Sequence, residues 1–473
     1  MDIKHVVVLM LENRSFDCML GMLYPKSSSF DGLDGTESNT WHLPDDSQQP
    51  IQVWTDPSMS PQAVYIPDPD PGELFTDIHM QIQGMLDKDT VNTGAPTMGG
   101  FVDNYMRRPA TTPPPDRFSI MHYFTPDHVP VISQLARAFG VSDRWHASAP
   151  CQTWPNRFFA HTGTAYGYVN NSPTHFPYQM ETVFNRLAAA GKDWRIYFHD
   201  FPQAATLARL WDDVPSKFRF FEGDFIKDAA AGTLPAYSFI EPRFFADPVL
   251  NKLPSDEHPP HNVAYGEELI ATVYNAVRAG PGWQQTLLVI TYDEHGGCYD
   301  HAVPPPATPP DGRTPDGYNF GTFGVRVPAV IVSPYVRAGS IIRPSGLMPF
   351  DHTSIIATLR KLFALAPLTE RDAAAPDLLA ALDDNPGNDG PGSVTAPAVP
   401  PVSPLVARAA AKSLNDLQRS LSTAALQLPT LGADIGLHIQ RLESAVDVAP
   451  APATVAEAIS DISAHVRAFL GLP

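Results

Sequence analysis

The sequence is poor in cysteine and in positive charge, and it has no long hydrophobic run. Its three cysteines, Cys18, Cys151 and Cys298, are too few for a disulfide framework. No CxxC motif or Cys/His spacing accompanies them, which argues against a cysteine-based metal site. We predict that they fill small apolar gaps close to the candidate site described below.

Basic residues are scarce relative to acidic ones. The chain of 473 residues carries 32 Lys and Arg against 51 Asp and Glu, which gives a formal net charge of −19. Nucleic acid needs a basic binding face, so this balance excludes nucleic acid as the expected partner and disfavours electrostatic docking on anionic lipid. A phosphorylated substrate stays compatible, because one bound metal ion can reverse the local field.

Long apolar runs are also missing. The first run, Val6–Leu11, is interrupted by Glu12, and a membrane helix needs about 20 apolar residues. The same run is too short for a signal peptide, and no small-residue cleavage site follows it. We therefore expect no integral membrane contact and, from the chain as given, a cytoplasmic protein.

Two apolar segments each end in oxygen-bearing side chains. Val6–Leu11 is followed by Glu12 and Asn13, and residues 286–292 are followed by Asp293 and Glu294. Both segments read as strands buried on both faces, and ligands of open α/β sheets bind at the carboxyl ends of such strands. The pattern predicts a metal site at this edge. The alternative is that Glu12 and Asn13 merely cap the next helix.

Further strands and helices alternate along the chain. This order predicts an α/β fold, a doubly wound and mostly parallel sheet with helices on both faces. The expected strands are 194–198, 236–240 and 327–332, and the expected helices are 129–146, 267–277 and 353–363.

Composition divides the chain into regions. We expect a main domain over residues 1–383, with an irregular insertion at 27–115 that is rich in Ser, Asp, Pro and Gly and forms a lid or a pocket wall. Residues 384–404 resemble a Pro/Gly-rich linker. Residues 405–473 form a small α-helical region whose apolar stripes either cover the main domain or join subunits in a homo-oligomer.

The segment around Thr153 predicts a helix start, with Pro155 two positions later. Free backbone N–H groups at a helix start favour phosphate, and Asn156 and Arg157 add an amide and a guanidinium. A nearby metal ion would turn the Thr153 hydroxyl into a candidate nucleophile. A capping threonine is the commoner reading of such a residue taken alone.

Histidines supply the remaining chemistry. Prolines separate His258 from His261, a pair suited to metal binding or to acid–base catalysis near neutral pH, although both could be solvated loop residues. His352 stands at another expected helix start, where it could contact metal or phosphate. His301 follows Asp300 and is expected at most to order its loop.

Taken together, five motifs in this order carry a family resemblance: ENRSFD, TWPNR, DEHPPH, YDEHGGCYDH and DHTS. Over residues 1–365 the chain resembles the bacterial phosphoesterase family of phospholipases C and AcpA-type acid phosphatases, within the alkaline phosphatase superfamily. The resemblance implies an alkaline-phosphatase-like fold. Many relatives are secreted, so a secreted or periplasmic location is the alternative to a cytoplasmic one.

The resemblance also assigns roles to residues. It implies Glu12, Asn13, Asp293 and Glu294 as metal ligands, Thr153 as metal-bound nucleophile, and His258 and His261 beside the phosphoryl group. Asn156, Arg157 and His352 are the expected substrate contacts. Glu73 stands where relatives tend to have a phosphate-binding histidine. The β-rich carboxyl-terminal modules of the haemolytic phospholipases are absent, which makes membrane attack a less favoured function.

The expected activity is metal-dependent hydrolysis of phosphomonoesters or phospholipid head groups through a phosphothreonine. The ion is divalent, with Ca, Mg and Zn as close alternatives, because oxygen ligands favour the first two and added histidine favours zinc. A sulfatase would need a modified Cys or Ser where Thr153 stands, and it remains an alternative together with a phosphonate hydrolase or a non-catalytic relative.

Overall fold

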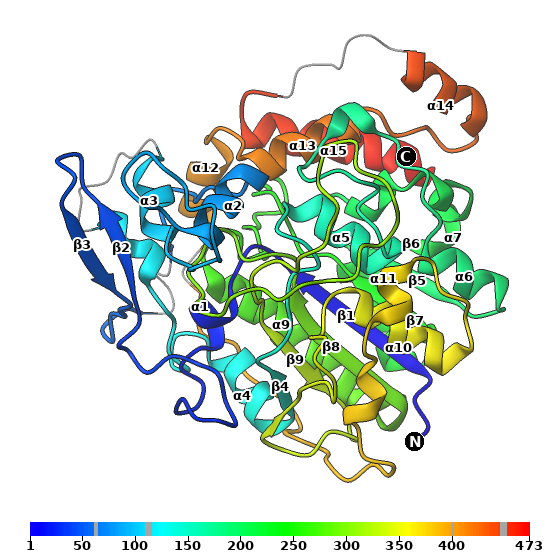
Figure 1. Ribbon diagram of the computed structural model, residues 1–473. Helices are drawn as coiled ribbons and strands as arrows, with labels where there is room; N and C mark the ends of the chain where they lie inside the picture. Colours follow the sequence, from blue (N-terminus) through cyan, green and yellow to red (C-terminus); the bar gives the residue numbers. More distant parts are fainter. Residues whose placement is uncertain (61–64, 109–115, 400–401, 445–451) are drawn as a thin grey trace.

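The computed structural model describes residues 1–60, 65–108, 116–399, 402–444 and 452–473, and an eight-stranded sheet forms its centre (Figure 1). The strands lie in the order β10-β4-β9-β8-β1-β7-β5-β6. Their bounds are β1 His5–Leu11, β4 Gly140–Ser142, β5 Trp194–Phe198, β6 Phe218–Phe220, β7 Tyr237–Ile240, β8 Thr286–Tyr292, β9 Ala329–Val332 and β10 Ser340–Ile341.

The two central strands, β1 and β8, run parallel to each other over their whole length. The register pairs His5 with Thr286 and Leu11 with Tyr292. Val, Ile and Leu dominate both strands because helices or loops cover each face of the sheet here. The matched register brings the residues that follow the two strands, Glu12 and Asp293, to the same edge.

The sheet is parallel apart from one strand. Only β9, among the described strands of this sheet, pairs antiparallel, with β4 on one side and β8 on the other. All other pairs in the sheet are parallel. This confirms the α/β class and the mostly parallel sheet that the sequence predicts.

Helices pack around this sheet in groups. The long helix α9 contacts β1, β8 and α4, whereas α10 contacts α5 and α11, and α6 contacts β5. The helices of residues 1–399 are α1 Phe16–Leu20, α2 Phe75–Gln83, α3 Phe101–Met106, α4 Pro130–Ala138, α5 Thr153–Thr162, α6 Val183–Ala189, α7 Val214–Lys217, α8 Ile226–Ala231, α9 Val263–Ala279, α10 Thr353–Phe363 and α11 Glu370–Ala374.

One expected helix is too long. The apolar spacing over 129–146 predicts a single helix, but α4 ends at Ala138 and β4 begins at Gly140. Gly140 lies so close to Ile342 and Val336 that a Cβ atom there would approach their side chains to 2.5 and 3.0 Å. The chain therefore turns from helix into a short strand where only glycine fits.

The insertion at 27–115 contains more regular structure than its composition predicts. A two-stranded antiparallel sheet, β2 Ser38–His42 and β3 Gln48–Gln52, precedes α2 and α3. These elements share a separate apolar core that includes Ile51, Ile78 and Phe101. Loop-type residues still join them, which is why composition alone predicts an irregular segment.

The segment predicted as a linker lies along α9. Arg278 donates from Nε to the carbonyl of Asp389 at 2.8 Å, and Asn275 donates from Nδ2 to the carbonyl of Val394 at 2.9 Å. Beyond it come α12 Ser403–Ala410, α13 Asp416–Ala425, α14 Ile435–Ser444 and α15 Val455–Leu470. The division of the chain into domains remains a prediction.

Of the carboxyl-terminal helices, α13 and α15 lie across the main domain, whereas α14 projects from the molecule (Figure 1). The apolar stripe of α15 is buried, and Phe469 lies against the rings of Trp211 and Phe218. Gln418 of α13 donates to the backbone carbonyl of Phe244 at 2.8 Å. Of the two roles open for these stripes, the structure shows packing within the chain, and a homo-oligomer stays a prediction.

The lack of long apolar runs and the low number of cysteines can both be compared with the described residues. None of their helices is both long and apolar enough to cross a membrane. All three cysteines are free and buried. Cys18 and Cys298 belong to the main apolar core, and Cys151 belongs to a smaller one, as expected of gap-filling residues.

Candidate active site

Glu12 and Asn13 lie at the carboxyl end of β1 and do not cap the next helix. That helix, α1, is capped by Ser15, whose side chain accepts a hydrogen bond from the backbone of Cys18. Asn13 instead adopts a left-handed backbone with φ of 58°, and its N–H donates to Asp293 Oδ1 at 3.0 Å. The ends of β1 and β8 are thus joined directly, and the capping alternative is wrong.

Gly296 allows the loop after β8, which carries Asp293 and Glu294, to approach the loop after β1, which carries Glu12 and Asn13. Gly296, two residues after Glu294, donates its N–H to Glu294 Oε2 at 2.8 Å. Its φ is 59°, and a Cβ atom at this position would lie 2.2 Å from the carbonyl oxygen of Asn13. Only glycine meets both requirements, so the loop after β8 can close onto the loop after β1.

Thr153 is the first residue of α5 and points towards the acidic group. Its hydroxyl lies 3.2 Å from Glu12 Oε2 and 3.4 Å from Asn13 Oδ1, with the threonine 1% exposed. The helix cap is Gln152, and no side chain makes the capping hydrogen bond. Thr153 is therefore free of the capping role that a single threonine usually has.

Arg157 provides the positive charge beside the acids. From α5, one turn after Thr153, its Nη2 lies 2.5 Å from Glu12 Oε1 and its Nε lies 3.5 Å from Asp293 Oδ2. All three side chains are fully buried. The guanidinium thus neutralises part of the acidic group, and its predicted contact with substrate stays a prediction.

Asn156 makes hydrogen bonds to the backbone around it. Its Oδ1 accepts from Ala149 N, and its Nδ2 donates to the carbonyls of Ala149, Cys151 and Gln152. The backbone N–H groups at the helix start, which were expected to bind phosphate, are also partly engaged by the protein. Trp154 N–H donates to Asn171 Oδ1 at 2.8 Å, and Pro155 has no N–H. A phosphate at this helix start would therefore find fewer free amides than the sequence predicts.

The acidic group fits a divalent cation. Asp293 Oδ2 is buried without a hydrogen-bond partner, and Asn13 Oδ1 and Glu12 Oε2 both face the Thr153 hydroxyl. Burial, followed by other contributions that include the nearby Asp293, raises the pKa of Glu12 well above its usual value despite Arg157. Buried oxygen donors whose charges exceed their counter-charge are suited to a hard metal ion.

Glu294 is the fourth expected ligand, and it is held firmly. Its Oε1 accepts from Asn13 Nδ2 at 2.8 Å, and its Oε2 accepts from Gly296. Burial and then the neighbouring carboxylate of Glu73 raise its pKa well above the usual value. The four predicted ligands and the predicted nucleophile are therefore brought together, and their roles stay predictions.

The two histidines of the 258–261 loop differ in environment. His258 is fully buried, with Nε2 at 3.4 Å from Glu73 Oε1 and Nδ1 at 2.7 Å from the carbonyl of Pro259. His261 is partly exposed, and its Nδ1 lies 2.7 Å from Asp256 Oδ1. The two rings are 6.0 Å apart. The loop thus presents one buried and one accessible imidazole.

His352 lies behind the site, where it contacts protein. Its Nε2 lies 2.5 Å from the backbone carbonyl of Asp293, and Trp145 Nε1 donates to its Nδ1 at 3.3 Å. Burial lowers its pKa, which keeps the ring neutral. It therefore anchors the loop that carries Asp293, and a direct phosphate contact stays a prediction.

Asp70 and Glu73 join the site from the insertion. Glu73 Oε1 accepts from Asn13 Nδ2 at 2.8 Å, and Asp70 Oδ1 lies 3.7 Å from His258 Nδ1. In the sequence, Glu73 stands out only because relatives tend to have a histidine there, and Asp70 carries no such signal. Acidic residues held between prolines, as in DPDPGE, are the signal that could have indicated an ordered acidic loop.

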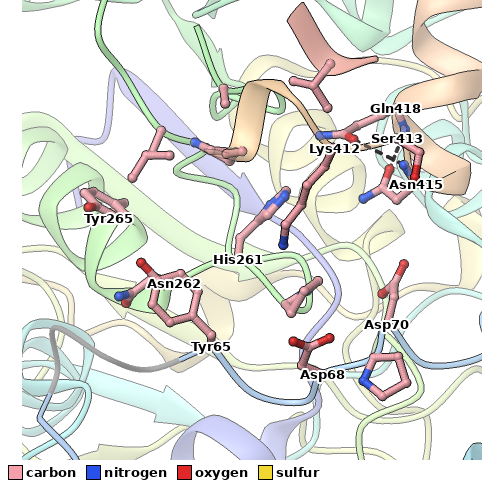
Figure 2. A pocket seen from close by; sticks show the side chains of 17 residues that line it. Tyr65, Asp68, Asp70, His261, Asn262, Tyr265, Lys412, Ser413, Asn415 and Gln418 are labelled. Atoms are coloured by element: carbon pink, nitrogen blue, oxygen red, sulfur yellow. Dashed lines mark hydrogen bonds between the residues drawn. The ribbon is translucent and has the colours of Figure 1, made fainter. Parts of the chain in front are cut away.

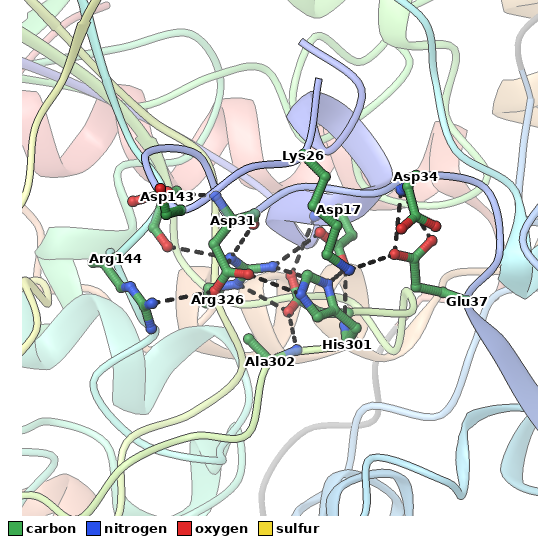
Figure 3. Close-up of polar contacts among 12 residues, drawn as sticks. Asp17, Lys26, Asp31, Asp34, Glu37, Asp143, Arg144, His301, Ala302 and Arg326 are labelled. Atoms are coloured by element: carbon green, nitrogen blue, oxygen red, sulfur yellow. Dashed lines mark hydrogen bonds and ion pairs between the residues drawn. The ribbon is translucent and has the colours of Figure 1, made fainter. Parts of the chain in front are cut away.

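A second polar cluster supports the two ligand loops from outside (Figure 3). Arg326 donates to Asp17 Oδ1 and Asp300 Oδ1, both at 2.9 Å, and His301 Nδ1 lies 2.6 Å from Asp17 Oδ2. Burial alone would lower the pKa of His301, but hydrogen bonds to Asp17 and Asp31 raise it to about 10. His301 thus orders its loop, as expected.

A cavity of about 260 Å³ lies beside the histidine loop (Figure 2). His261 and Asp70 line it from the main domain, and residues of the carboxyl-terminal region close the opposite side. Apolar groups contribute much of the wall. The lining residues from the carboxyl-terminal region are Ala409, Lys412, Ser413, Asn415, Gln418 and Val455.

Comparison with known proteins identifies the family. The model of the phosphoesterase family matches residues 3–366. The chain belongs to the phosphoesterase family. Non-specific phospholipase C1 of Arabidopsis thaliana is 39% identical over 391 residues, covering 79% of this chain and 69% of the relative. Phospholipase C A of Mycobacterium tuberculosis is 28% identical over 410 residues, covering 77% and 73%. This phosphoesterase is a hydrolase of phosphoric ester bonds.

Solved structures overlap with the phosphoesterase only in part. A phosphonate monoester hydrolase of Agrobacterium radiobacter covers 54% of this chain and 72% of its own, with 12% identity and a TM-score of 0.33. A protein in the alkaline phosphatase superfamily from Vibrio parahaemolyticus gives 11% identity and a TM-score of 0.32, covering 52% and 64%. With overlaps this limited, the fold class rests on the sheet described above.

Proposed function

We propose that this phosphoesterase is a metal-dependent phospholipase C that transfers the phosphoryl group to Thr153 before water releases it. The observation that carries the proposal is the position of the Thr153 hydroxyl, 3.2 Å from Glu12 and 3.4 Å from Asn13 in a buried acidic group. A threonine that is neither capping nor exposed, and that faces such a group, is suited to nucleophilic attack.

In the first step the Thr153 oxygen forms a bond to phosphorus as the bond to the leaving alcohol breaks. Thr153 passes its proton to Glu12, whose Oε2 lies 3.2 Å from the hydroxyl. A divalent ion bound by Glu12, Asn13, Thr153, Asp293 and Glu294 would stabilise the alkoxide and the phosphoryl charge. Water then attacks the phosphothreonine and restores the hydroxyl.

The leaving alcohol takes a proton from the histidine loop, and we assign this role to His261. His261 lines the cavity and is oriented by Asp256 at 2.7 Å, whereas His258 is fully buried between Glu73 and Asp70. An accessible, oriented imidazole is the better proton donor to an alcohol that must enter and leave.

The cavity beside His261 suits the alcohol part of a phospholipid. Tyr65, Leu253 and Tyr265 give it apolar walls, and Asp68 and Lys412 place charges at its lining. The names of the relatives, phospholipases C, agree with this substrate class. We therefore expect phosphatidylcholine to be a better substrate than a small phosphomonoester such as p-nitrophenyl phosphate.

The test of the nucleophile compares Thr153→Ala with Thr153→Ser. The alanine variant should lose at least about a thousandfold in kcat, because no oxygen remains to form the phosphoryl bond, while the serine variant should retain activity. Acid quench of the wild type with phosphatidylcholine, followed by mass spectrometry, should show phosphocholine on Thr153, because only the bond to the lipid alcohol has been broken. Near-normal turnover by Thr153→Ala would overturn the proposal.

The test of His261 uses leaving groups of different pKa. His261→Gln should slow hydrolysis of phosphatidylcholine about a hundredfold or more, because the alcohol leaves poorly without a proton. Hydrolysis of p-nitrophenyl phosphate should fall far less, since p-nitrophenolate is a stable anion. Equal losses on both substrates would contradict the assignment of His261 as proton donor.

A further inference from the structure

We propose that Asp70, Glu73 and His258 form a second divalent-cation site beside the oxygen site at the strand ends. One ligand atom from each of these three residues lies within 4.8 Å of the others. Its three ligands differ from those proposed for the first ion. The second site goes beyond the proposed phospholipase reaction and does not depend on Thr153 as the nucleophile.

An unpartnered buried nitrogen points into this cluster. His258 is 0% exposed, and its Nε2 has no hydrogen-bond partner although it lies 3.4 Å from Glu73 Oε1. Asp70 Oδ1 is likewise buried without a partner. Orphaned polar atoms of this kind are rare in folded proteins, and a bound ion is one of the few arrangements that satisfies them.

The other ring nitrogen of His258 is already engaged. Nδ1 lies 2.7 Å from the backbone carbonyl of Pro259, which can only accept, so Nδ1 carries the proton. The lone pair of a neutral ring then resides on Nε2, which faces Glu73. Histidines that bind metal ions commonly donate their second N–H to a backbone carbonyl in this way.

Charge points to the same conclusion. The side chains of Glu12, Glu73, Asp293 and Glu294 lie within one buried region, and Arg157 is the guanidinium that pairs with two of them. If His258 is neutral, one divalent ion at the first site leaves Glu73 and Asp70 uncompensated, in a place that a phosphate anion must approach. A second cation removes this repulsion.

A protonated His258 is the competing arrangement. Burial disfavours the imidazolium, but the carboxylates of Glu73 and Asp70 outweigh burial and raise the pKa of His258 well above its usual value. An imidazolium would form an ion pair with Glu73 Oε1 at 3.4 Å, although the geometry is not that of an aligned hydrogen bond. The two arrangements differ in what occupies the cluster, a proton or a metal ion, and they can be told apart directly.

Asn13 connects the two cation sites. Its Oδ1 faces Thr153, and its Nδ2 donates at 2.8 Å both to Glu73 Oε1 and to Glu294 Oε1. The donor sets differ in chemistry, because the first site offers only oxygen and the second offers two carboxylates and one imidazole. Such a mixed set favours Zn²⁺ or Mn²⁺ over Ca²⁺.

The experiment loads the full-length apo protein with Mn²⁺ and measures bound metal by mass spectrometry and pulsed electron paramagnetic resonance. We expect two Mn²⁺ per chain, with nitrogen modulation from one imidazole. Glu73→Gln keeps the acceptor for Asn13 but removes the charge, and it should weaken one of the two sites at least tenfold. Asp70→Asn should do the same, and His258→Gln should abolish the nitrogen modulation.

Matched controls separate this site from the first one. Asp68→Asn removes an exposed carboxylate two positions from Asp70 and should leave both sites intact. Asp293→Asn should remove the oxygen site and preserve the nitrogen modulation. One Mn²⁺ per chain without nitrogen modulation, lost in Asp293→Asn and unchanged in Glu73→Gln, would overturn the second site and leave the proposed function standing.

Discussion

At the scale of single residues, the candidate site depends on charges that are buried together. Arg157 reaches Glu12 and Asp293 with no exposed surface, so each partner relies on the others for its charge state. Taking one partner out of such a group costs more than the group gains by forming, because an unpaired charge remains buried. Arg157 is accordingly expected to matter for folding as well as for catalysis.

Arg157→Met should lower the free energy of unfolding of the metal-free protein by about 3–5 kcal/mol, measured by urea denaturation. Arg157→Lys keeps a charge at this position and should recover part of the loss. An Arg157→Met protein as stable as the wild type would show that Glu12 and Asp293 are not both ionised in the metal-free state.

Gly296 gives a residue-scale test of the approach between the two ligand loops. Gly296→Ala places a Cβ atom 2.2 Å from the carbonyl of Asn13 in a backbone with positive φ, so Asn13 must shift. We expect a loss of about 1–3 kcal/mol in stability together with a large loss of kcat. Gly312→Ala is the control, because a Cβ atom there meets no heavy atom within 4 Å.

At the scale of elements, the structure places a carboxylate of one helix at the start of another. Glu267 on α9 accepts hydrogen bonds from the N–H groups of Val131 and Ile132 in the first turn of α4. Burial raises the pKa of Glu267 to about 8, and the two N–H donors only partly offset it. The contact therefore joins two helices through a carboxyl group whose pKa of about 8 favours the protonated form at neutral pH.

The sign of the resulting pH dependence follows from the raised pKa. Between the unfolded value of about 4.5 and pH 8 the folded state binds the extra proton, so stability falls as pH rises, by up to about 1.4 kcal/mol per pH unit. Glu267→Gln should flatten this slope in urea titrations at several pH values. Glu268→Gln, on the exposed side of α9, should leave the slope unchanged.

The elements that the sequence predicts well are those with a strong periodic pattern. Residues 194–198, 286–292 and 353–363 form β5, β8 and α10 with the expected bounds. Short elements were missed, including β4 and the β2–β3 hairpin, because three to five residues carry too little pattern to stand out from a loop. The close approach of Gly140 to Ile342 and Val336 could not be predicted, because these side chains are distant from it in the sequence.

The candidate site was likewise predictable only where it depends on strongly patterned strands. Motifs at strand ends predicted that Glu12, Asn13 and Asp293 would meet, and the parallel register of β1 and β8 is the physical reason that they do. Asp70 could not be predicted, because the fold of the insertion brings it to His258 from an otherwise irregular loop. The engagement of Asn156 with backbone carbonyls was equally hidden, since it depends on the path of residues 149–152.

At the scale of the whole molecule, the carboxyl-terminal helices are part of the packed core. Phe469 lies against Trp211 and Phe218, and residues of α12 and α13 close the cavity that His261 lines. The tail therefore contributes both to stability and to the wall of the proposed substrate pocket. Removal of the tail would expose the apolar surface of the main domain on which α15 packs.

Phe469→Ala should lower the free energy of unfolding by about 3–5 kcal/mol, because a large buried ring is lost and the space is only partly refilled. Leu472→Ala, at an exposed position three residues later, is the control and should change stability by less than about 0.5 kcal/mol. Equal effects of the two substitutions would show that α15 is not docked as described.

The shared register of β1 and β8 has a consequence for how the protein unfolds and loses activity. The proposed metal ligands Glu12 and Asp293 directly follow the two innermost strands, so they cannot separate while that hydrogen-bonded ladder persists, and they cannot stay together once it opens. Inactivation in rising denaturant should then track the loss of secondary structure at one common midpoint. The candidate site should then persist for as long as the central strands stay paired.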